Sequence, residues 1–176
     1  SKTSTPIVFF GINNNPRYYY EKNELPKNIS GVLERTPIVP WIRYLGKMFP
    51  DAKAALVLLD SSPTSKAIID VVFQERRVLR IGGFTVERRI SKNWPEWKNI
   101  VKNSGKYDLI VMPTFHSVKD EAGVIVSVED VVEWTSANTP IPVFSNQDYT
   151  VSSKGVIGAY VIYGEAHGRL AGQIAL

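Results

Sequence analysis

The feature that most constrains this fold is a regular alternation between short apolar runs and amphipathic segments. The run 54–59 (Ala-Ala-Leu-Val-Leu-Leu) is apolar at every position. Such a run is typical of a parallel strand that is buried on both faces of a sheet. In the segment 37–49 the apolar residues recur at spacings of three and four, which indicates an amphipathic helix. The alternation predicts an α/β protein with a mainly parallel sheet, flanking helices and right-handed crossovers.

The predicted elements follow one another along the whole chain. Asn93 and Ser127 are expected to cap helices, and Thr64 or Ser65 a third. The segment 26–32, which contains Pro26 and Gly31, is interpreted as a break between elements. We predict strands at 5–11, 54–59, 80–87 (kinked at its glycine pair), 107–113, 141–145 and 156–163, and helices at 37–49, 66–74, 94–103, 127–137 and 165–176.

Composition narrows the possible chemistry. With 176 residues, 44% of them hydrophobic, the chain can form a substantial core without crosslinks. The absence of cysteine excludes disulfides, cysteine-based metal sites and a thiol nucleophile within this sequence, and the two histidines lie far apart. The net charge is +4, and the densest basic stretch, residues 76–92, flanks an apolar strand. We therefore interpret that stretch as a solvated strand surface rather than a nucleic-acid site. No apolar run is long enough to cross a bilayer.

Polar residues follow several of the predicted strands. In an open parallel sheet, ligands bind outside the carboxyl ends of the strands. The segments at these ends are 13–15, 60–65, 114–117 and 146–149, and each contains uncharged hydrogen-bonding side chains. This pattern is typical of a site for a small polar molecule. Tyr18, Tyr19 and Tyr20 could stack on a ligand ring or could equally cover the edge of the core.

Each polar group also has a plainer interpretation. The hydroxyls of segment 61–65 could hold an anion at a helix terminus or only cap that helix. Asp60 and Asp148 could be a catalytic pair of carboxylates, but aspartates in such loops more often orient the backbone. His116 could contact a ligand or act as a base, although a lone loop histidine usually does neither. The sequence contains no Walker A loop, no dinucleotide fingerprint and no nucleophile elbow, so we predict no cofactor and no enzymatic activity.

An ordered series of segments resembles a known family. Segment 5–16 (Thr-Pro-Ile-Val-Phe-Phe-Gly-Ile-Asn-Asn-Asn-Pro) and segment 28–32 (Asn-Ile-Ser-Gly-Val) are similar to motifs of periplasmic substrate-binding proteins of ABC transporters. The subgroup is the one that includes tryptophan- and tyrosine-binding components. The series continues with segments 49–53, 60–65, 140–145 and 155–164. The chain also resembles related extracytoplasmic sensor domains, which precede histidine kinases, and segment 143–150 is most similar to those.

The resemblance implies a type I periplasmic-binding-protein fold with two lobes. Because family members have several further strand–helix units before the first segment, it implies that this chain is a fragment. Residues 1–30 would be a remnant of the first lobe, 31–150 the nearly complete second lobe, and 151–176 a return crossing with a terminal helix. By the resemblance, the chain would cross between lobes near Ser30–Gly31 and again around 151–155. The family often has an acidic residue where Asn14 or Asn15 stands here, which leaves the ligand's identity open.

By resemblance, the function is non-catalytic binding of an amino acid or a similar solute in a cleft between lobes. The partner would be an ABC permease and the location periplasmic. Segment 61–65 would hold the ligand carboxylate and Asp148 its ammonium group. Alternatives are a ligand-sensing domain, a small α/β enzyme, and a fragment unable to bind ligand. The expected contact residues are Asn13, Asn14, Asp60, Ser61, Ser62, Thr64, Ser65, Thr114, Phe115, Gln147 and Asp148.

Overall fold

The structure, a computed structural model, describes residues 5–176 and divides into two compact units. The terminal unit comprises the chain up to Thr36 together with Ile162–Leu176, and the central unit is Pro37–Val161. The predicted domain boundaries, at 30/31 and 150/151, differ from these unit boundaries, which lie at 36/37 and 161/162. Ser30–Gly31, the predicted first crossing, lies inside a strand of the terminal unit, and the chain leaves that unit only after Thr36.

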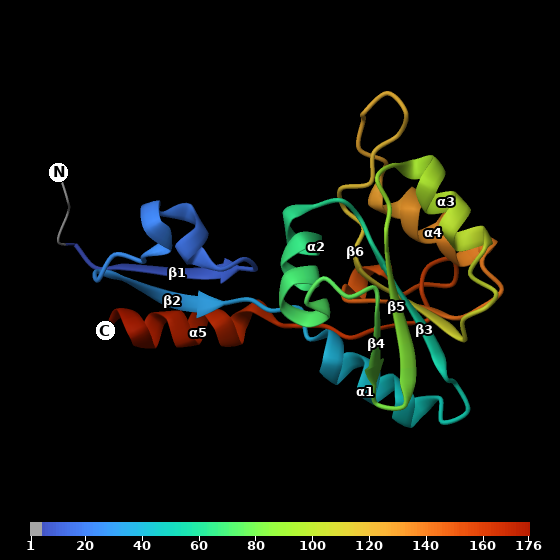
Figure 1. Ribbon diagram of the computed structural model, residues 1–176, viewed down its shortest axis with the longest axis horizontal. Coiled ribbons are helices and arrows are strands. Elements are labelled where there is room, and N and C mark those ends of the chain that lie inside the picture. The colour runs from blue at the N-terminus through green and yellow to red at the C-terminus, as the bar shows by residue number, and fades with distance from the viewer. Residues whose placement is uncertain (1–4) are drawn as a thin grey trace. The chain divides into compact units, whose positions relative to one another are not determined.

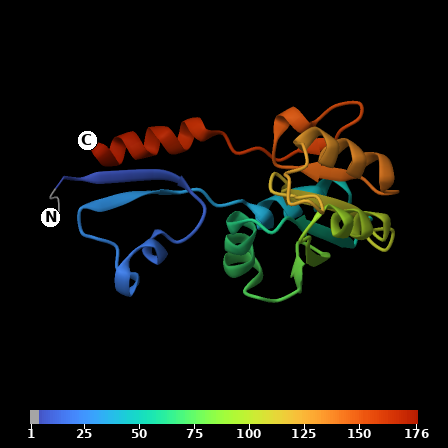
Figure 2. The same ribbon diagram turned by 90° about the horizontal axis from the view of Figure 1, so that it is seen from above.

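The terminal unit is a pair of parallel strands with one helix. Strand β1 (Ile7–Ile12) pairs with β2 (Ile29–Leu33), and Phe9 lies opposite Gly31. Helix α5 (Gly164–Ala175) packs against both strands, and Figure 2 shows it running alongside them. Two short 3-10 turns, Pro16–Tyr19 and Glu21–Asn23, connect the strands in place of a helix.

Strand β2 is the element that the sequence did not predict. The segment was interpreted as a break because it contains asparagine, serine and glycine, which are poor strand formers. In the structure, β1 supplies the backbone hydrogen-bond partners of β2. The glycine at position 31 is required because a side chain there would clash with β1. A Cβ atom at Gly31 would lie 2.1 Å from the Phe9 carbonyl oxygen, so only glycine permits this close approach.

The central unit is a six-stranded sheet in the order β4-β5-β3-β6-β7-β8 (Figure 1). All neighbouring strands are parallel except β4 and β5. This confirms the predicted α/β class with a mainly parallel sheet. The strands are β3 (Ala54–Leu59), β4 (Val78–Ile81), β5 (Phe84–Ile90), β6 (Leu109–Thr114), β7 (Val143–Ser145) and β8 (Gly158–Ala159). The helices are α1 (Ile38–Met48), α2 (Pro63–Ile68, continued by a π turn over Ile69–Phe73), α3 (Trp94–Lys102) and α4 (Val128–Asn138).

The core of the central unit forms two hydrophobic layers, one on each face of the sheet. Val57 and Leu59 of β3 pack with α1 and α2, whereas Leu56 and Leu58 pack with α3 and α4. Strand β3 is therefore buried on both faces, as its unbroken apolar run predicted. Trp97 is anchored within the second layer, since its indole N–H donates to the Thr135 hydroxyl at 2.8 Å.

Two predicted strands differ from the structure. Segment 80–87 is an antiparallel hairpin of β4 and β5 rather than one kinked strand. Gly82 and Gly83 both have positive φ, +56° and +91°, which the tight two-residue turn requires. The last predicted strand, 156–163, is reduced to the two residues of β8.

Candidate functional site

The loops that follow β3, β6 and β7 meet at the carboxyl edge of the central sheet. Because these strands are parallel, their carboxyl ends lie at the same edge. Two hydrogen bonds join the loops. The backbone N–H of Ser117, after β6, donates to Asp60 Oδ2, after β3, at 3.0 Å. His116 Nε2 lies 2.6 Å from the hydroxyl of Tyr149, which follows β7.

Asp60 fixes two of these loops. Its carboxylate is only 1% exposed and accepts three hydrogen bonds from the protein itself. Besides Ser117, the donors are the Ser65 hydroxyl at 2.7 Å and the Ser62 backbone N–H at 3.1 Å. These donors occupy both carboxylate oxygens, so the structure gives Asp60 the role of holding the loops together. A contact between Asp60 and a ligand stays a prediction.

Ser65, Thr114 and Phe115 also face the interior. The Ser65 and Thr114 hydroxyls lie 2.7 Å apart and both residues are buried. Phe115 is fully buried in the hydrophobic layer beside α3 and α4. The sequence placed a ligand against these side chains, but in this structure they contact the protein's own core.

The amino terminus of α2 differs from the prediction. Its cap is Ser62, whose hydroxyl accepts from the Ser65 backbone N–H at 3.3 Å, rather than Thr64 or Ser65. Pro63 occupies the first helical position and has no N–H group. With the Ser62 and Ser65 N–H groups already bonded, little of this terminus is left for an anion. Ser61 is exposed and Thr64 partly so, and these two hydroxyls are the part of segment 61–65 that a ligand could reach.

His116 and Tyr149 form a polar pair at this edge, and each has one part of its ring covered by the protein and another part exposed. The His116 ring stacks on Phe115, with centroids 4.3 Å apart. Burial lowers the pKa of His116, and the negative charge of Asp60 opposes this effect only in part, so the imidazole is neutral near pH 7. Burial and the nearby charge of Asp148 raise the pKa of Tyr149, which keeps its phenol protonated. The pair can thus offer one neutral donor or acceptor to a polar molecule.

The loop after β7 contains an unsatisfied group. Asn146 Oδ1 is buried and has no hydrogen-bond partner among the described residues. A buried amide oxygen without a donor is costly, so this atom is suited to accept a hydrogen bond from a bound molecule. Beside it, Gln147 is partly exposed and Asp148 is exposed. Segment 146–149 was singled out for its polarity, yet Asn146 and Tyr149 were not chosen, because only the coordinates show that Asn146 Oδ1 lacks a partner among the described residues and that Tyr149 pairs with His116.

Asn13 and Asn14 belong to the terminal unit. They follow β1, and each takes part in shaping the turn. The Asn13 carbonyl accepts a hydrogen bond from Arg35 at 2.5 Å, and Asn14 Oδ1 accepts from the Asn15 backbone N–H at 2.8 Å. All other predicted contact residues lie in the central unit.

Among the depressions away from this edge, two have a clear place in the fold. One, of about 1010 Å³, is in the terminal unit beside the connection between β1 and β2. The other, of about 430 Å³, is lined by α4 and by the segments before β7 and β8, which places it at the amino edge of the sheet. Among the described residues, no group of His, Asp and Glu side chains is arranged to hold a metal ion. None of the described helices is both long and apolar enough to span a bilayer.

Comparison with known proteins supports the fold. No protein-family model matches the chain, and no curated protein does. Among solved structures, it is similar to a conserved domain protein from Vibrio cholerae O1 biovar El Tor strain N16961, with a TM-score of 0.52 and 16% sequence identity. The match covers 83% of this chain and 48% of that one, so the chain spans about half the length of its structural neighbour. At this identity the likeness shows the α/β architecture alone.

Proposed function

We propose that this chain binds a small polar molecule, an amino acid or a similar solute, at the carboxyl edge of the central sheet. The observation that supports this most directly is the meeting of three strand-exit loops, joined by the Asp60–Ser117 and His116–Tyr149 contacts. Following the resemblance described above, the binding would serve uptake through an ABC permease. In this scheme no bond of the ligand is made or broken.

The available groups divide into donors and acceptors. The hydroxyls of Ser61 and Tyr149 are exposed and can donate to a ligand carboxylate. Asp148 is exposed and can face a ligand ammonium, and Asn146 Oδ1 can accept an N–H. The buried trio of Asp60, Ser65 and Thr114 would keep these groups in place without touching the ligand.

A purely structural role explains some of these residues but not all of them. Asp60, Ser65 and Thr114 form hydrogen bonds with one another and with neighbouring backbone groups. These bonds hold the loops after β3 and β6 together, which is a structural role. Asn146 Oδ1 takes no part in these hydrogen bonds, because it is buried and has no partner among the described residues. A ligand N–H that reached Asn146 Oδ1 after a movement of this loop would satisfy it, and this is the group at the edge that a structural role leaves unexplained.

The test is a thermal-shift screen of the chain against amino acids and small polar metabolites, followed by calorimetry. We expect at least one compound to raise the melting temperature, and the rise to grow with the logarithm of its concentration above the dissociation constant. Tyr149→Phe removes one hydroxyl and should weaken that compound about three- to tenfold, the usual value of one hydrogen bond. Asn146→Leu should weaken it by a similar factor.

The matched control is Tyr163→Phe, which removes the same hydroxyl from an exposed tyrosine of the terminal unit. It should leave the affinity unchanged. Failure of every compound to bind, or equal affinity in Tyr149→Phe and the parent, would contradict the proposal. If the chain converted a compound chemically and Asp148→Ala abolished that conversion, the function would be catalysis rather than binding.

A further inference from the structure

One half of the central sheet has a face without a helical layer over its side chains. In β5, Phe84 and Val86 point into the core beside α1, so Thr85, Glu87 and Arg89 point to the opposite face. The pairing of β4 with β5 places Val78 opposite Glu87 and Arg80 opposite Thr85 on that same face. There Val78 is 45% exposed, and Arg80 is exposed as well. Strands β4 and β5 are antiparallel, and an antiparallel pair can leave one face open to solvent or to a partner.

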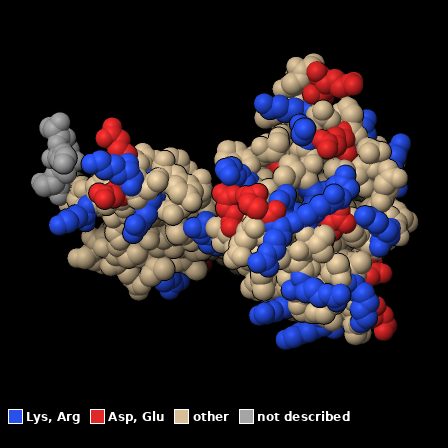
Figure 3. All heavy atoms as spheres, in the orientation of Figure 1, with Lys and Arg blue, Asp and Glu red and all other residues tan. Residues whose placement is uncertain are grey.

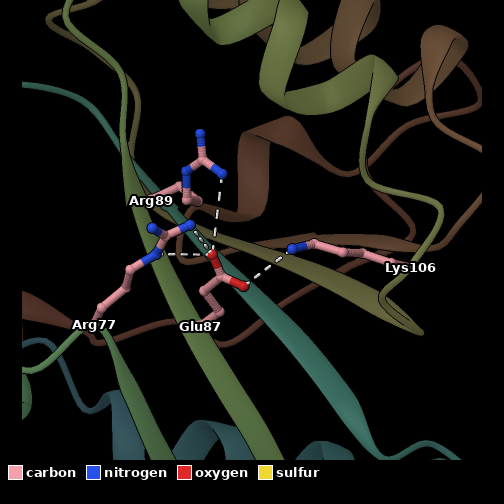
Figure 4. A network of polar contacts seen from close by, with 4 residues as sticks. All are labelled: Arg77, Glu87, Arg89 and Lys106. Atoms are coloured by element: carbon pink, nitrogen blue, oxygen red, sulfur yellow. Dashed lines mark hydrogen bonds and ion pairs between the residues drawn. The ribbon is translucent and has the colours of Figure 1, made fainter.

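The open face is strongly basic. Three cations share a single carboxylate, that of Glu87 (Figure 4). Arg77 donates to Glu87 Oε1 through Nη2 at 2.6 Å and Nε at 3.0 Å, and Lys106 Nζ lies 3.2 Å from Oε2. Arg89 Nη1 lies 4.0 Å from Oε1. Together with Arg80, which has no ion-pair partner among the described residues, these groups form what we call the basic sheet face: Arg77, Arg80, Glu87, Arg89 and Lys106.

The carboxylate in this network is hidden while the cations are not. The side chain of Glu87 is 14% exposed, whereas those of Arg77 and Lys106 are more than half exposed. A partner approaching the face therefore meets mainly positive charge. Figure 3 shows this as a band of blue side chains across the central unit, over the region of β4 and β5.

Stability alone does not account for this arrangement. Arg77 alone already gives Glu87 two hydrogen bonds, so the further exposed cations, Arg89 and Lys106, add little to folding and repel their neighbours. What Glu87 does achieve is orientation, because it holds the guanidinium of Arg77 by two hydrogen bonds. Oriented guanidinium groups are well suited to bind further carboxylates in bidentate fashion.

We propose that the basic sheet face is a docking surface for an acidic segment of a protein partner. Its charge complements a row of Asp or Glu side chains, and the exposed Val78, opposite Glu87 on the edge strand β4, offers an apolar contact beside the cations. A second copy of this chain does not fit, because the chain has a net charge of +4 and the face would meet like charge. A few cations on one short stretch of sheet match a short acidic peptide better than a long polyanion, whose binding requires many phosphate contacts. This proposal is independent of the small-molecule site.

The experiment measures binding of the chain to a fluorescent oligoglutamate peptide of about ten residues, by anisotropy at low ionic strength. We expect saturable binding that weakens as salt is raised, because the contacts are charged and exposed. Arg80→Glu combined with Arg89→Glu should reduce the affinity about tenfold or more. If that variant is poorly folded by circular dichroism, Arg80→Gln combined with Arg89→Gln should still give a smaller loss in the same direction.

The matched control is Lys47→Glu combined with Lys119→Glu. It changes the net charge by the same amount at two exposed lysines outside the basic sheet face. Its affinity should stay within about twofold of the parent, apart from a general charge effect. The proposal is overturned if the control loses as much affinity as Arg80→Glu with Arg89→Glu. It is also overturned if the peptide does not bind, or if single-stranded DNA or phosphatidylserine vesicles bind more tightly than the peptide.

Discussion

The two units of this chain differ in how much of their strands they bury from solvent. The central unit places helices on both faces of a six-stranded sheet, and every residue of β6 is buried. The terminal unit has two parallel strands and one helix, and no residue of β1 is buried. A two-stranded parallel sheet with one covered face cannot exclude water from its strands. Folding free energy should therefore come almost entirely from the central unit.

The same contrast appears in the aromatic residues. Phe73, Phe84 and Trp97 of the central unit are fully buried. Phe10 and the tyrosines at 18–20 of the terminal unit are largely exposed. The contrast shows that the terminal unit buries few of its aromatic side chains.

The largest expected effect comes from a matched pair of phenylalanines. Phe84 is 1% exposed in the central unit and Phe10 is 61% exposed in the terminal unit. Phe84→Ala should lower the free energy of unfolding by about 3–5 kcal/mol, because it leaves a cavity in the core. Phe10→Ala should change it by no more than about 0.5 kcal/mol. Urea unfolding followed by circular dichroism measures both, and equal losses would show that the terminal unit has a core of its own.

A smaller effect is expected from ion pairs. Burial would raise the pKa of Glu87, but its hydrogen bonds, above all from Arg77, lower it to about 2. Because this folded-state pKa lies below that of the unfolded chain, the stabilisation is complete above about pH 4.5 and is lost as the pH falls towards 2. Glu87→Gln should cost about 1–3 kcal/mol at pH 7 and much less at pH 2.

The terminal unit supplies the control for this prediction. Glu165 and Arg169 form an i,i+4 pair on α5 with both side chains exposed. Glu165→Gln should cost at most about 0.5 kcal/mol at any pH. Unfolding measured at pH 7 and at pH 2–3 tests both variants. If the Glu87→Gln loss were the same at the two pH values, the ion pairs of Glu87 would not be the cause.

The sequence predicted the central unit well because its signals are local. The apolar run of β3 and the amphipathic spacing of α1 each identify an element without reference to the rest of the chain. Asn93 and Ser127 were correctly expected to cap α3 and α4, since each is followed at once by a helical pattern. Strand β2 was missed because its pairing with β1 depends on contacts between segments about twenty residues apart.

The sequence could predict where the candidate site lies, but not which of its side chains contact one another. Polarity at the ends of the strands identified the loops, and the parallel sheet brings three of them together. The sequence could not show that Asp60, Ser65 and Thr114 bond to one another, because hydrogen-bond partners are set by side-chain positions. For the same reason it could not show that Asn146 Oδ1 is buried without a partner.

The smallest expected effect on the free energy of unfolding comes from removing one helix cap in each unit. Asn93 Oδ1 accepts the Glu96 N–H at 3.0 Å and caps the nine-residue helix α3. Asn15 Oδ1 accepts the Arg17 N–H at 3.1 Å, but it caps only a four-residue 3-10 turn. Asn93→Ala should cost about 1 kcal/mol, because α3 packs on the core through Trp97 and depends on its first turn.

Asn15→Ala should cost only a few tenths of a kcal/mol, about the limit of detection, because a short turn outside the core can open without exposing apolar surface. Both variants can be measured by the midpoint of urea unfolding at a constant slope. A loss at Asn15 that matched the loss at Asn93 would mean that the connection between β1 and β2 unfolds together with the central sheet. The division of folding free energy between the units would then fail, since the terminal unit would share one cooperative transition with the central one.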